Sequence, residues 1–266
     1  MTGKTIYLDH QATTPLAPEA LEAMLPWLSG PDSMGFANPH SMHRAGRAAA
    51  AAVELAREQV AALLPKGGRV IFTSGATEAL NQALRAVPRG LIAYSAIEHS
   101  AVVNAAIASG ADVHELPVGP AGLIDPEVPL PAGVGLVAVM QVNNEIGTIQ
   151  PVERLAERTH EAGALFLCDA VQGAGKLAPP EGADLIAITA HKLYGPKGIG
   201  ALWVRDGVKI GPLMKRKLLL PSLSSSRTSE PRTSAGIRSG VHWMRAVVAP
   251  SICGASAGCT RAVECW

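Results

Sequence analysis

Polar side chains follow four apolar, strand-like runs of this sequence, at the point where each run ends. Residues 69–73 lead into Ser74-Gly75-Ala76-Thr77-Glu78, residues 134–142 into Asn143-Asn144-Glu145, residues 164–168 into Asp169-Ala170-Val171-Gln172, and residues 185–189 into Ala190-His191-Lys192. One polar strand end is ordinary. Four of them, meeting at the carboxyl edge of one parallel sheet, indicate a shared ligand site.

The segment Ser74-Gly75-Ala76-Thr77 opens a predicted helix directly after a strand. Free amides and the helix dipole at such a position favour an anion such as phosphate. Helix capping by Ser74 or Thr77, with Glu78 in the first turn, is the alternative, and the segment alone leaves both open. It is not a Walker loop, and it lacks the G-x-G-x-x-G spacing, so it gives little support to a dinucleotide site.

A carboxylate and an amine end two of the buried runs. Asp169 is costly at such a position unless it is paired, and a pyridinium N–H would pair it; a helix cap or an ordinary buried Asp is the alternative. Desolvation can remove the proton of Lys192, and a neutral lysine forms a Schiff base with a carbonyl; a surface lysine is the alternative. Lys197, in the turn-like Gly195-Pro196-Lys197-Gly198, is the rival lysine.

An anion site, a carboxylate for a ring nitrogen and a Schiff-base lysine together describe a site for pyridoxal 5'-phosphate. The protein's part with this cofactor is to hold it, to charge its ring nitrogen and to supply the lysine. His99 follows another predicted strand and could stack on the ring or move protons. A single histidine is more often structural, so its role depends on the other three groups. No residue is assigned to a metal.

The elements that would position these residues alternate along the chain. Short apolar runs predict strands at residues 69–73, 91–94, 112–116, 134–142, 164–168, 185–189 and 201–204. Helical patterns cover residues 44–64, 76–87, 100–109 and 152–162, and Asn38-Pro39-His40 marks a loop. This alternation predicts an α/β protein with a mostly parallel sheet and helices on both faces.

Composition restricts the class of protein. The 266 residues are 48% apolar and 17% charged, which indicates a globular chain with a sizeable core. A formal net charge of +1 gives no support to binding of nucleic acid or of a membrane surface. No apolar stretch is long enough for a transmembrane helix. The start of the chain lacks a signal region and four cysteines do not suit a disulfide scaffold, so we expect a cytoplasmic protein.

Charge is distributed unevenly along the chain. Residues 215–266 hold eight lysines and arginines against two glutamates, a charge of +6, which leaves −5 for the other 214 residues. Cys253, Cys259 and Cys265 lie in the same part. We therefore predict a domain of residues 1–214 and a basic, poorly ordered tail of residues 215–266. A partner-binding arm, or a tail that is not native and follows a reading-frame change, are the alternatives.

Seven motifs occur along residues 5 to 213 in a fixed order. Through these motifs the sequence resembles the cysteine desulfurases, the NifS/IscS-like group of the class V aminotransferase fold. Any one motif would be weak, but the ordered series is specific. The motifs are YLDHQATTP (7–15), NPHSMHRAG (38–46), FTSGATE (72–78), EH (98–99), VNNEIG (142–147), DAVQ (169–172) and HKLYGPKGIG (191–200).

The resemblance implies the large domain of a fold type I pyridoxal-phosphate transferase and a role for each matching residue. Lys192 would bind the cofactor as a Schiff base, Asp169 would pair with its ring nitrogen, and His99 would stack on the ring and assist proton transfer. Gln172 would bind the phenolic oxygen, and Asn144 would lie near the substrate carboxylate. The phosphate would be held by Ala76, Thr77, Thr189 and His191.

The reaction implied by the resemblance removes sulfur from L-cysteine and yields L-alanine and an enzyme persulfide. The sulfur would then serve iron–sulfur cluster or thio-cofactor assembly. The resemblance also implies a homodimer and a sulfur-acceptor or scaffold protein as partner.

The sequence departs from the family pattern after residue 213. Family members continue into a small C-terminal domain, here largely missing, with which the first 15 residues could pack. Arg238-Ser239-Gly240-Val241 matches the family's Arg-Ser-Gly-Thr only in part, and no cysteine matches the family's loop cysteine. Cys168 precedes Asp169 on a buried strand and is expected to be inert. The alternatives are therefore an inactive fragment, or a selenocysteine lyase or aminotransferase of the same fold.

Overall fold

The computed structural model describes residues 6–30, 32, 35–86 and 90–213. The boundary predicted at residue 214, the basic tail and its three cysteines lie outside the described residues, so those predictions stay predictions.

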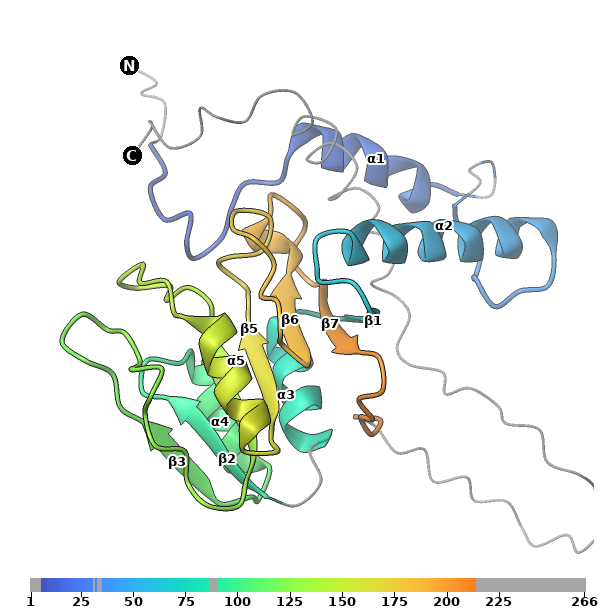
Figure 1. Cartoon of the computed structure of the whole chain (residues 1–266). Coiled ribbons are helices and arrows are strands. Elements are labelled where there is room, and N and C mark those ends of the chain that lie inside the picture. The colour runs from blue at the N-terminus through green and yellow to red at the C-terminus, as the bar shows by residue number, and fades with distance from the viewer. Residues whose placement is uncertain (1–5, 31, 33–34, 87–89, 214–266) are drawn as a thin grey trace, which may run out of the picture.

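A seven-stranded sheet forms the centre of the described part (Figure 1). Its strand order is β1-β7-β6-β5-β4-β2-β3, and the five strands from β6 to β3 run parallel. The mostly parallel sheet predicted from the sequence is thereby confirmed. The strands are β1 (Gly68–Thr73), β2 (Leu91–Ser95), β3 (Val113–Leu116), β4 (Val134–Met140), β5 (Leu165–Asp169), β6 (Leu185–Thr189) and β7 (Gly200–Arg205).

Strand β7 is the exception, since it runs antiparallel to both β6 and β1. Only residues 190–199 separate the end of β6 from the start of β7. A parallel connection needs a crossover of a dozen or more residues, so this short link returns the chain in the opposite direction. The link contains the single-turn helix η1 (Ala190–Lys192), and the reversal therefore keeps Lys192 at the carboxyl end of β6.

Helices cover both faces of the sheet, as predicted. Helices α3 (Ala76–Ala86) and α4 (Ser100–Ala108) pack on one face, through a core that includes Leu80 and Leu167. Helix α5 (Val152–Glu161) and the end of α2 (Arg44–Ala61) contribute to the core of the other face, which includes Phe166 and Trp203. Because both faces are buried, β4 to β6 are almost continuously apolar, which explains why these runs were recognisable in the sequence.

The end of α5 shows how local sequence aims a strand at the site. Gly163 adopts a φ of +73°, and the Ala164 amide donates to the Thr159 carbonyl at 3.0 Å, which closes the helix with a Schellman turn. The chain then enters β5, which ends in Asp169. The sequence pattern predicted this strand one residue too early, and Asp169 is its last residue instead of the first residue beyond it.

Helix α1 (Pro18–Leu28) was not predicted. It buries only Ala20 and Met24 in a small cluster of its own, and it lies apart from the sheet core in Figure 1. Its apolar residues Leu21, Leu25 and Leu28 are exposed, and Pro26 lies within it. A helix with so small a buried face and an internal proline gives a weak periodic signal. None of the described helices is long and apolar enough to cross a membrane.

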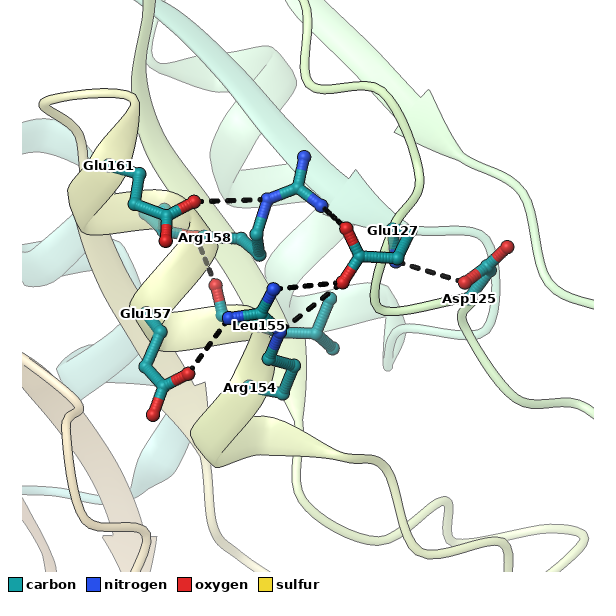
Figure 2. A network of polar contacts seen from close by, with 8 residues as sticks. Asp125, Glu127, Arg154, Leu155, Glu157, Arg158 and Glu161 are labelled. Carbon is teal, nitrogen blue, oxygen red and sulfur yellow. Dashed lines mark hydrogen bonds and ion pairs between the residues drawn. The ribbon is translucent and has the colours of Figure 1, made fainter.

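Residues 117–133 connect β3 to β4 and are held against α5 by charged groups (Figure 2). Glu127 pairs with Arg154 at 3.0 Å and also with Arg158, while Glu157 and Glu161 pair with the same two arginines. Exposed ion pairs contribute only about 0.2–1 kcal/mol each. The buried Gln150 accepts from the Ile124 amide and donates to the Gly122 carbonyl, and these buried bonds hold the same connection more firmly.

Candidate functional site

A pocket of about 820 Å³ opens at the carboxyl ends of the parallel strands. All nine residues predicted for the site line it, so the structure brings them together as parallel strands with a common edge require. Their individual roles stay predictions. The nine are Ala76, Thr77, His99, Asn144, Asp169, Gln172, Thr189, His191 and Lys192.

Asp169 is the buried carboxylate of the pocket. Its side chain belongs to the last residue of β5, is 6% exposed, and accepts a hydrogen bond from the Val171 amide at 3.0 Å. Burial raises the pKa of this carboxyl, while the Val171 amide and the positive charges of His99 and Lys192 lower it. A buried carboxylate that borders a pocket is stabilised by a cationic N–H donor placed in that pocket.

Lys192 ends η1, opposite the N-terminal part of the chain. Its Nζ donates to the Gln11 carbonyl. Burial lowers the pKa of this amine, the charge of Lys176 lowers it further, and Asp169 and Asp9 act against both. A lowered pKa increases the fraction of neutral amine, which is the form that attacks a carbonyl. The sequence did not reveal Lys176 as a neighbour, because it acts from the turn after β5.

Lys197, the rival lysine, also lines the pocket. It is exposed and follows Tyr194, which has a φ of +59° and begins the turn that the sequence indicated. Pocket geometry alone thus admits two lysines. They differ in burial, because Lys197 is exposed, whereas Lys192 is half-buried and burial lowers the pKa of its amine.

The N-terminus of α3 forms the end of the pocket predicted to hold an anion. Glu78 accepts the Ser74 amide at 2.7 Å, so part of the capping alternative is correct. Ala76 and Thr77 open the helix and border the pocket, and the first amides of a helix have no partner within it. Capping and anion binding are therefore compatible. A Cβ on Gly200 would lie 2.6 Å from the Gly75 carbonyl carbon, so β7 approaches this turn too closely for any side chain.

Thr189 and His191 lie beside that end, on the segment that follows β6. The Thr189 hydroxyl donates to the Ile199 carbonyl at 3.3 Å, and the His191 ring contacts the Thr13 hydroxyl at 3.2 Å. The pKa of His191 is lowered, first by burial and then by the charges of Lys192 and Lys197. His191 is thus mainly neutral, and it would serve an anion as a hydrogen-bond donor.

His99 is the N-cap of α4, because its Nδ1 accepts from the Ala101 amide at 3.1 Å. The neutral ring therefore carries its proton on Nε2. Asn144 donates to its neighbour Glu145 at 2.8 Å. The buried Asn143 donates to the Ile97 carbonyl at 2.9 Å and so connects the end of β4 to the segment that carries His99.

An N-terminal segment that sequence reasoning missed also lines the pocket, through Asp9, Gln11, Ala12 and Thr13. The Gln11 carbonyl accepts from Gln172 Nε2 at 2.8 Å and from Lys192 Nζ, so one main-chain oxygen joins two predicted cofactor ligands. Thr14 holds this segment in place, since its amide donates to the His191 carbonyl and its hydroxyl accepts from the Tyr194 amide, both at 2.8 Å. The signal was the motif of residues 7–15, for which the sequence suggested only packing with the small C-terminal domain.

Cys168, the residue before Asp169, is fully buried. Burial raises the pKa of its thiol well above the ordinary range, and the negative charge of Asp169 raises it further. The thiolate is the reactive form of cysteine. We therefore expect iodoacetamide to leave Cys168 unmodified in the native protein and to modify it fully in the urea-unfolded protein. Mass spectrometry of the peptide that contains Cys168 measures both states. Rapid native labelling of that peptide would contradict the buried placement.

Pyridoxal phosphate fits the groups present in the pocket. The buried Asp169 carboxylate matches a protonated ring nitrogen, the half-buried amine of Lys192 matches an aldehyde, and the first turn of α3 matches a phosphate. His99, Gln172 and Asn144 border the same space. When bound, the cofactor would supply an electron sink for bond cleavage in the substrate.

Comparison with known proteins agrees with this chemistry. The family model described as aminotransferase class-V matches residues 6–217. A cysteine desulfurase of Cereibacter sphaeroides is 46% identical over 228 residues, covering 79% of this chain and 58% of that protein. The cysteine desulfurase IscS of Dictyoglomus turgidum is 41% identical, covering 79% of this chain and 57% of that protein.

Solved structures of related proteins share the fold. A NifS-like protein superposes with a TM-score of 0.79 at 31% identity, covering 94% of this chain and 69% of that one. SspA in complex with cysteine has a TM-score of 0.71 at 35% identity, covering 79% of this chain and 65% of that one. The chain thus spans a little more than half the length of the curated relatives it matches. It belongs to the class V aminotransferase family of pyridoxal-phosphate enzymes, and within that family it is similar to the NifS/IscS-like cysteine desulfurases.

Proposed function

We propose that this protein is a pyridoxal-phosphate-dependent cysteine desulfurase, which removes sulfur from L-cysteine and releases L-alanine. The observation that carries the proposal is the meeting of Asp169, Lys192 and His99 in one pocket, in a chain whose relatives are cysteine desulfurases. The related structure described as a complex with cysteine supports L-cysteine as the substrate. Sulfur delivery to iron–sulfur or thio-cofactor assembly, a sulfur-acceptor protein, a homodimer and a cytoplasmic location belong to the same proposal.

The residues divide the work according to their environments. Asp169, buried and anionic, would stabilise positive charge on the ring nitrogen, and the first turn of α3 would hold the phosphate. Lys192 would attack the aldehyde as a neutral amine and could afterwards accept or return a proton at Nζ. His99 would exchange protons through Nε2, because its Nδ1 already accepts from α4. Gln172 would orient the ring from the side of residues 9–13.

The proposed reaction needs a thiolate that accepts the substrate's sulfur atom. A new sulfur–sulfur bond forms as the carbon–sulfur bond breaks, and the carbon then takes up a proton. Cys168 is the only cysteine among the described residues, and its buried, protonated thiol cannot accept the sulfur. The acceptor in the proposal is therefore another thiol, either from residues outside the described ranges or from a partner.

The direct test incubates the 266-residue chain with pyridoxal phosphate, L-cysteine and dithiothreitol, and measures alanine and sulfide. We expect both products in equal amounts, and neither from the Lys192→Ala variant. Parallel reactions with L-selenocysteine and with an amino acid plus a 2-oxo acid distinguish a selenocysteine lyase and an aminotransferase. Cofactor binding without any turnover would instead identify a non-catalytic fragment, the alternative that the departure from the family pattern after residue 213 left open.

A further inference from the structure

Glu98 is a partly exposed acidic residue with a buried carboxyl oxygen, and neither the sequence motifs nor the proposed reaction assigns it a task. It stands between β2 and His99, and its Oε1 accepts from the Met140 amide at 2.6 Å. Its Oε2 is buried and has no hydrogen-bond partner among the described residues. Met140 is the register partner of Asp169 across β4 and β5, so Glu98 reaches the sheet edge that carries the site's carboxylate.

The charges around Glu98 favour its protonated form. Burial raises its pKa well above the ordinary range, the negative charge of Asp169 raises it further, and the bond from Met140 opposes both. Positive charge on His99 or Lys192 acts to lower the pKa of Asp169, and Cys168, which precedes Asp169 in β5, is a protonated thiol. A second buried anion without a cation would be costly, whereas an unpartnered oxygen of a neutral acid costs far less.

We propose that Glu98 is a positioning residue that works as a neutral acid: it fastens the segment carrying His99 to the end of β4 and leaves Asp169 as the charged member of the two neighbouring carboxyl groups. Two bonds fasten this segment, one from the Met140 amide to Glu98 and one from Asn143 to the Ile97 carbonyl. The role of Glu98 in placing His99 rests on the proposed cofactor site, whereas the protonation state of Glu98 is independent of that proposal.

Two substitutions of Glu98 distinguish its function as a hydrogen-bond acceptor for the Met140 amide from the effect of a negative charge at this position. Glu98→Gln keeps an oxygen for the Met140 amide and is neutral at every pH. Glu98→Ala removes the acceptor and leaves that amide without its partner, which costs about as much as one buried hydrogen bond. Glu115→Gln, on the exposed strand β3, is the matched control for removal of one glutamate charge elsewhere.

The first experiment uses the cofactor-free chain and measures urea unfolding from about pH 5 to about pH 9. A group whose pKa is raised on folding contributes stability at low pH, and this contribution is lost as the pH rises through the folded pKa. Wild type and Glu115→Gln should therefore lose stability with rising pH more steeply than Glu98→Gln, which should become the more stable protein at the alkaline end. Parallel curves for wild type and Glu98→Gln, or failure of Glu98→Gln to fold, would overturn the proposal.

The second experiment measures pyridoxal phosphate affinity and the pH dependence of the bound cofactor's absorption. Glu98→Gln should bind like wild type, with an absorption that is less sensitive to alkaline pH, and Glu98→Ala should bind roughly tenfold more weakly. Equal loss in both variants would show that an ionised carboxylate is needed and would reject the neutral-acid role. If wild type binds no cofactor, the proposed function fails, yet the unfolding curves still decide the state of Glu98.

Discussion

Replacing Lys192 with alanine is expected to abolish covalent attachment of pyridoxal phosphate, while Lys197→Ala is expected to leave it intact. Both lysines line the pocket, but Lys197 is exposed, whereas Lys192 lies at the carboxyl end of β6, where burial and the charge of Lys176 lower the pKa of its amine. A neutral amine is needed for attack on the aldehyde, so this difference selects Lys192. Borohydride reduction followed by intact-mass measurement reports attachment, and peptide mapping reports the lysine.

The matched variant makes this result decisive. Lys197→Ala removes one amine from the same pocket without touching β6 or η1, so it controls for the loss of positive charge. Attachment that survives in Lys192→Ala and disappears in Lys197→Ala would reverse the assignment. Attachment to neither lysine in the wild-type chain would remove the cofactor from the proposal.

Asp169→Asn is expected to change stability and cofactor binding in opposite directions. Burial raises the pKa of Asp169, so its contribution to folding is present at low pH and is lost as the pH rises through the folded pKa. Asparagine cannot ionise, and the cofactor-free variant should therefore be more stable than wild type at neutral and alkaline pH. Urea unfolding at several pH values measures this gain.

The same substitution removes the charge proposed to stabilise the ring nitrogen. Breaking a buried ion pair costs about 3–5 kcal/mol, so we expect affinity for pyridoxal phosphate to fall by about 150- to 5,000-fold. Titration of cofactor-free protein, followed by absorption, gives the affinity. A stabilised variant that binds the cofactor as tightly as wild type would show that Asp169 does not face the ring nitrogen.

Strands were predictable where both of their faces are buried. The bounds of β6 match the apolar run at residues 185–189, since an almost unbroken apolar run has few alternative interpretations. Strand β4 ends at Met140, two residues before the predicted end, because Val142 leaves the ladder and pairs with Ile149 in an isolated bridge. Helix α1 escaped prediction because it buries only two side chains.

Sequence alone determined the family and, through the resemblance of its motifs, the nine residues that meet in the pocket. They meet there because parallel strands place their carboxyl ends at one edge whatever their order. Only the tertiary structure decided the features that depend on long-range contacts and on burial. It brought the Gln11 carbonyl to Lys192, 181 residues away, reversed β7, and placed Glu98 Oε2 in a buried position without a partner. Periodicity and motifs in a sequence indicate local structure and which face of an element is buried. A pKa or a long-range hydrogen bond depends instead on which distant groups the fold brings together and shields from water.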